Sequence, residues 1–85
     1  MIVFLVVVMF FKGTIYNGRR YYVCSSKEDA VKKMTSIIVE ESEQLLEGES
    51  MDLEIIRKEE GDEKEYILYK GYLSRDEDLL DTISV

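Results

Sequence analysis

The sequence predicts an α+β fold: a small antiparallel sheet of about four strands in β-β-α-β-β-α order, with one long helix and a short C-terminal helix on one face. Three features carry this prediction. An apolar run opens the chain, a long amphipathic pattern fills its middle, and two strand-like segments around a polar glycine loop follow. The length of 85 residues accommodates one domain, 1–85, and no more.

The apolar run covers residues 1–11 and consists mainly of Val, Ile, Leu and Phe. As a helix it would be about 16 Å long, roughly half of the hydrocarbon core of a membrane. It has neither the basic start nor the small-residue cleavage site of a signal peptide. We therefore expect no membrane segment and a cytoplasmic protein. Stiff β-branched residues favour a strand.

Both faces of this strand would be apolar, because alternate residues point to opposite sides. A strand of this kind needs cover on both faces, and one helix supplies cover for one face only. We therefore predict a homodimer that pairs or packs residues 2–11 across a two-fold axis. The self-association residues that we expect are Ile2, Phe4, Val6, Val8 and Phe10.

Asn17-Gly18 predicts a tight hairpin turn, since both residue types accept the positive φ of a type I′ turn. This turn would pair Tyr16 with Arg19 and Lys12 with Val23. Residues 2–9 would then overhang the second strand and need another neighbour.

A capping box at Ser25 and Glu28 predicts that a helix begins near residue 26. Gly48 is suited to the position just after its end, so the helix would cover about 26–47. The apolar positions with helical spacing are Ala30, Val31, Met34, Ile37, Ile38, Leu45 and Leu46.

The rest of the chain predicts a second hairpin and a short helix. Residues 52–58 and 65–73 have strand-like composition and enclose the polar loop 59–63. Ser74 is a suitable cap for a helix over 75–83, with Leu79, Leu80 and Ile83 as its apolar stripe.

Charge is divided unevenly along the chain. Residues 1–27 hold four bases and no acid, whereas all 18 acids lie in 28–85, and the net charge is −7. Such acids fit a solvated surface that keeps the protein in solution, or an acidic face that binds a basic protein. The residues of this expected acidic face are Glu40, Glu43, Glu47, Glu59, Glu60, Asp62 and Glu63.

Arg19, Arg20 and Tyr22 predict an alternative, a nucleic-acid-binding β-ribbon that uses phosphate contacts and stacking. The net negative charge argues against it. The same arginines also fit a turn flanked by cross-strand tyrosines, or contacts with the acidic part of a second copy.

The residue inventory argues against catalysis. The chain has no His and one Cys, Cys24, so His-dependent triads and the usual zinc sites are excluded. We expect no enzyme activity, no cofactor and no metal. The chain is similar in size and charge, without a shared motif, to virus- and phage-encoded inhibitors such as anti-CRISPR proteins. That analogy suggests a small acidic interaction protein that inhibits a basic, nucleic-acid-handling protein. The low Asn and Gln content follows a thermophile trend.

Overall fold

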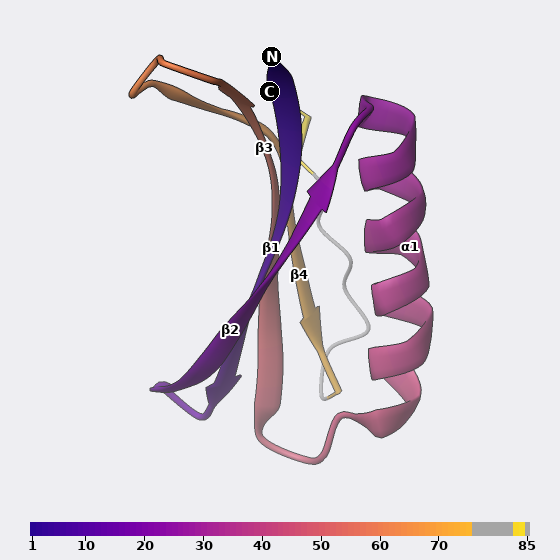
Figure 1. Ribbon diagram of the computed structural model, residues 1–85. Coiled ribbons are helices and arrows are strands. Elements are labelled where there is room, and N and C mark those ends of the chain that lie inside the picture. The colour runs from indigo at the N-terminus through magenta and orange to yellow at the C-terminus, as the bar shows by residue number, and fades with distance from the viewer. Residues whose placement is uncertain (76–82, 85) are drawn as a thin grey trace.

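The computed structural model describes residues 1–75 and 83–84 and confirms the α+β class (Figure 1). Its elements in chain order are β1 (Ile2–Lys12), β2 (Ile15–Cys24), α1 (Lys27–Gln44), β3 (Glu49–Glu59), β4 (Glu65–Ser74) and β5 (Ile83–Ser84). The expected C-terminal helix over 75–83 falls on residues 76–82, which lie outside the described residues, and on Ile83, which belongs to β5.

The sheet has the strand order β2-β1-β3-β4-β5, and every neighbouring pair is antiparallel. β1 lies between β2 and β3. Its pairing with β3 runs without interruption from Ile2 opposite Glu59 to Lys12 opposite Glu49. The expectation that residues 2–9 overhang their hairpin is therefore wrong, because β2 pairs with residues 4–12 and β3 pairs with residues 2–12 of β1, which leaves only Ile2 and Val3 without a partner on the β2 side.

The first turn lies at Gly13-Thr14, four residues before the predicted position. Lys12 is opposite Ile15, and Gly13 has a φ of 62° while its amide donates to the carbonyl of Gly48 at 2.7 Å. Asn17 instead sits in a β-bulge, where the register shifts between Phe10 and Phe11. The earlier turn lets β2 pair along nearly all of β1, and this longer ladder outweighs the local preference of Asn-Gly for a turn.

The helix begins one residue later and ends earlier than the sequence predicts. The N-cap is Ser26, whose Oγ accepts a hydrogen bond from the amide of Asp29 at 3.1 Å, so the expected cap at Ser25 is wrong by one position. α1 has 18 residues and a length of about 27 Å. Gly48, with a φ of 84°, lies in the link to β3 rather than directly after the helix.

The second hairpin agrees with the prediction. β3 and β4 pair from Ser50 opposite Ser74 to Lys58 opposite Glu65. In the connecting turn, Gly61 has a φ of 85°, and the amide of Lys64 donates to Oδ1 of Asp62 at 3.0 Å.

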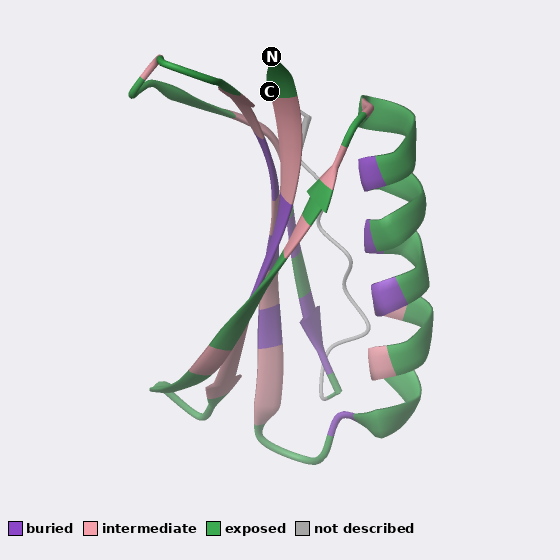
Figure 2. Cartoon of the chain, in the orientation of Figure 1, coloured by how far each residue is buried: buried purple, intermediate pink, exposed green. Residues whose placement is uncertain are grey.

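The hydrophobic core lies between α1 and one face of the sheet (Figure 2). Fully buried side chains of β1 and β3 form its floor, and the inner side of α1 closes it. The core residues are Val6, Val8, Ala30, Met34, Ile37, Leu45, Met51, Leu53, Ile55 and Leu73. Among the described residues, no helix has both the length and the apolar character needed to cross a membrane.

We expect Leu53→Ala to lower the free energy of unfolding by about 2–5 kcal/mol, because Leu53 is fully buried and its truncation leaves a cavity. Val39→Ala on the outer side of α1, where the side chain is 59% exposed, is the matched control and should change it by less than about 1 kcal/mol. Urea titration followed by circular dichroism measures both. Equal losses would contradict this placement of the core.

Ser26→Ala should cost about 1 kcal/mol of stability, because the amide of Asp29 loses its partner. Ser25→Ala, the matched control, removes the hydroxyl of the neighbouring serine, which does not cap the helix, and it should leave the free energy of unfolding almost unchanged. The same titrations compare the two variants, and a larger loss for Ser25→Ala would place the cap at the position that the sequence suggested.

Candidate interaction surface

The sheet has one face that α1 does not cover, and we call it the helix-free face (Figure 1). Side chains alternate along a strand, so the residues between the core positions point to this side. It is formed by Val3, Leu5, Val7, Met9 and Phe11 of β1, Arg19, Tyr21 and Val23 of β2, Asp52, Glu54 and Ile56 of β3, and Lys70 and Tyr72 of β4.

An apolar stripe along β1 occupies the centre of the helix-free face. Leu5 and Met9 are half-buried, whereas Val7 between them is buried. On β2, at one side of the stripe, Val23 is 70% exposed and Tyr21 is 54% exposed. The stripe therefore widens over β2 into an apolar area that faces solvent.

Charges of opposite sign lie on the two sides of this stripe. Met9 has Arg19 as its partner on β2 and Asp52 as its partner on β3. One row further along, Val7 lies between Tyr21 and Glu54. On the helix-free face, β2 is thus basic and phenolic and β3 is acidic, while β4 beyond it brings Lys70 next to Glu54 and Tyr72 next to Asp52.

Two tyrosines hold Arg19 on this face. Its Nε donates to the hydroxyl of Tyr16 at 3.0 Å, and one terminal nitrogen donates to the hydroxyl of Tyr21. The guanidinium also lies 5.9 Å and 5.6 Å from the centres of these rings. The hydrogen bonds to Tyr16 and Tyr21 raise the pKa of Arg19. The guanidinium is therefore a fixed positive charge with further N–H donors free for a partner.

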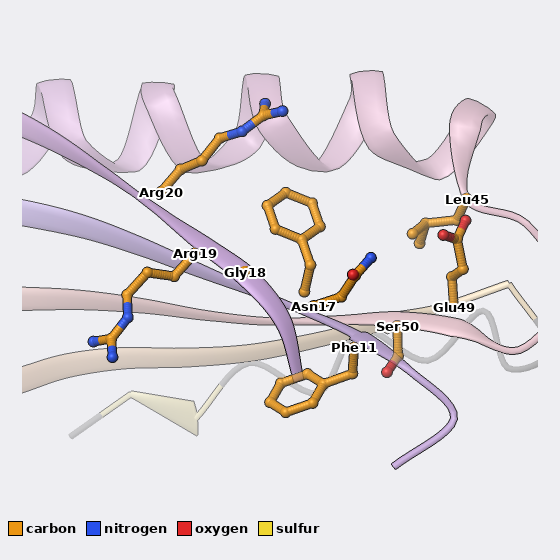
Figure 3. A pocket seen from close by; sticks show the side chains of 9 residues that line it. Phe11, Asn17, Gly18, Arg19, Arg20, Leu45, Glu49 and Ser50 are labelled. Carbon is orange, nitrogen blue, oxygen red and sulfur yellow. The ribbon is translucent and has the colours of Figure 1, made fainter. Parts of the chain in front are cut away.

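The arginines of the expected nucleic-acid ribbon point to opposite sides of β2 (Figure 3). Arg20 lies on the helix side, with its guanidinium 5.3 Å from the centre of the Phe10 ring. Tyr22 is also on that side, where Nζ of Lys33 is 4.5 Å from its ring centre. Arg19 is therefore separated from Arg20 and Tyr22 by the sheet, and the three do not form one surface.

A hollow of about 380 Å³ lies beside the bulge of β2 (Figure 3). Its lining comes from both strands of the first hairpin, from the residue after α1 and from the start of β3. The lining residues are Phe10, Phe11, Asn17, Gly18, Arg19, Arg20, Leu45, Glu49 and Ser50. The charged groups in this lining already have contacts. Glu49 accepts a hydrogen bond from the amide of Leu46 at 2.7 Å, and both arginines lie against aromatic rings.

The expected acidic face is divided between two places. Glu40, Glu43 and Glu47 lie at the C-terminal end of α1 and in the link after it, whereas the remaining residues, Glu59, Glu60, Asp62 and Glu63, lie at the β3–β4 turn. β3 runs the length of the sheet between these sites, so they are at opposite ends of a molecule 40 Å long (Figure 1). The structure therefore has two acidic ends rather than one acidic face.

The self-association residues expected from the sequence lie mostly on the helix side. Val6 and Val8 are 0% and 1% exposed, and Phe4 and Phe10 pack against the same core. Ile2, at the start of β1, is 40% exposed. The alternate residues of β1 face the side without a helix. Both sets are apolar, so the sequence contained no signal that distinguished them.

The described residues contain no group of three or more Cys, Asp or Glu side chains that could hold a metal ion. Cys24 is half-buried and packs against the core. No family model, curated protein or solved structure matches the chain. The inference about function therefore depends on the surface described above.

Proposed function

We propose that this chain is a non-catalytic interaction protein that binds another protein molecule through the helix-free face. The observation that carries the proposal is the exposed apolar area of Val23 and Tyr21 beside the β1 stripe. Apolar patches bounded by polar groups mark interaction sites in soluble proteins. Burying such surface contributes about 25 cal/mol per Å² of apolar area, against which the entropy cost of association must be set.

The charges favour a protein partner over a nucleic acid. Asp52 and Glu54 lie on the same face as Arg19, so a phosphate backbone that approached Arg19 would meet two carboxylates. The net charge of −7 adds long-range repulsion. A face with both signs of charge around an apolar centre suits a protein surface with the complementary arrangement.

The two acidic ends contribute less to binding than the helix-free face does. A basic protein, such as the target of a virus- or mobile-element-type inhibitor, would have to reach both ends or use one of them. Exposed carboxylates mainly steer association and are screened by salt. We therefore assign the main contact to the helix-free face and electrostatic guidance to the acidic ends.

The residue inventory supports a role without catalysis. The chain has no His, and its one thiol, that of Cys24, is half-buried on the helix side. The charged groups of the hollow beside the bulge are engaged in contacts of their own, as described above. The helix-free face has an exposed apolar area and fixed charges, and these features allow it to recognise another protein.

Val23→Asp should abolish the binding of protein by this chain, because it places a charge in the apolar area. Val39→Asp is the matched control, since Val39 is 59% exposed on the outer side of α1. The measurement is retention of protein, whether of the same chain or of native lysate, by immobilised wild type and both variants. Equal retention by Val23→Asp and Val39→Asp would contradict the proposal.

A further inference from the structure

We infer that the partner of the helix-free face is a second copy of this chain, packed face to face about a two-fold axis parallel to β1. This inference rests on the proposed function, and it adds the identity of the partner and the geometry of the contact. It follows from the sheet register, because the β2 side and the β3 side of the helix-free face are complementary to each other.

A two-fold axis along β1 places β2 of one copy over β3 of the other and preserves the rows of the register. In the first row, Arg19 of one copy lies over Asp52 of the other, because both are register partners of Met9. In the second row, Tyr21 lies over Glu54, because both are partners of Val7. A guanidinium thus faces a carboxylate, and a phenol faces a carboxylate.

The third row is apolar on both sides. Val23 and Ile56 are the two register partners of Leu5, so the same rotation places Val23 of one copy over Ile56 of the other. Along the axis itself, the β1 stripe packs on its own copy. All three pairings occur twice in an isologous dimer, and Val23, the most exposed apolar side chain of this face, becomes covered.

The pairing tolerates the usual angle between packed sheets. Strands of two aligned sheets cross at about 30°, which displaces strands at about 4.8 Å from the axis by about 2.5 Å along their length. That displacement is smaller than the ~6.8 Å between successive residues on one face. With the axis along β1, the strands β2, β1 and β3 overlap with those of the other copy, and β4 lies outside the contact. The overlapping strands have a footprint of roughly 500 Å² per copy, which is below the ~800 Å² per partner of a standard interface and typical of a weak, reversible dimer.

The alternative two-fold axis, in the same plane but across the strands, lacks this complementarity. It would place each strand over its own copy with the rows reversed. With Val7 at the centre, Glu54 would face Glu54, and Arg19 would face Val23. Like charges and a charge over an apolar side chain are both unfavourable. The charges therefore select the axis along β1.

The test exchanges the charges of the first row. R19D and D52R each place like charges opposite one another twice per dimer, so each should weaken self-association at least about tenfold relative to wild type. In an equimolar mixture, each R19D chain meets a D52R chain with opposite charges restored in both pairs. The mixture should therefore regain the dimer, and the double variant R19D/D52R should do so alone.

Sedimentation velocity over a range of protein concentrations measures these equilibria, and circular dichroism verifies that each variant is folded. K32D, which makes the same charge change as R19D at an exposed position of α1, is the matched control and should leave the dimer unchanged. R19Q removes the charge without reversing it. It should cause a smaller loss than R19D and replaces R19D if that variant does not fold.

Two results would overturn the inference. A wild-type chain that stays monomeric throughout excludes the second copy; the proposed function survives that result if retention of another protein is still lost in Val23→Asp. A dimer that R19D and D52R do not weaken, and whose mixture shows no preference for the heterodimer, uses a different surface, such as the exposed edge of β2.

Discussion

β1 requires apolar cover on both of its faces, and the rest of the structure depends on this requirement. Its central place between β2 and β3 satisfies its backbone hydrogen bonds, and α1 covers one of its faces with Val6 and Val8 at the centre. A helix on one side of a sheet leaves the other side to solvent or to another molecule. The helix-free face has an apolar stripe with flanking charges, and these are the features of a surface that another molecule covers.

Much of the fold was predictable because its signals are local. The apolar run predicted β1, the helical spacing predicted α1 to within three residues at each end, and the polar glycine loop predicted the second hairpin. The first turn was not predictable in this way. Asn17-Gly18 is the stronger local turn signal, but the choice of Gly13-Thr14 depends on how many residues of β2 then pair with β1, which is a long-range quantity.

Less of the candidate site was predictable from the sequence. The composition of β1 showed that both of its faces need apolar cover. It did not show which face α1 covers and which face is left for a partner, because the odd and even residues of the run are equally apolar. Arg19 and Arg20 are adjacent in the chain, yet alternation along β2 sends them to opposite faces. The acidic residues of 40–63 are close in sequence, yet β3 carries them to opposite ends of the molecule. Which residues share a face is set by register, which the bulge and the turn determine together.

Methionine oxidation of the purified chain tests most directly whether a second copy covers β1. Met9 lies half-buried on the helix-free face, Met1 is 83% exposed at the terminus, and Met51 is fully buried beneath α1. Peroxide oxidation followed by mass spectrometry gives a rate for each residue over a range of protein concentrations. We expect the rate at Met9 to fall as concentration rises, while Met1 stays reactive and Met51 stays protected. A rate at Met9 that does not depend on concentration would contradict the account.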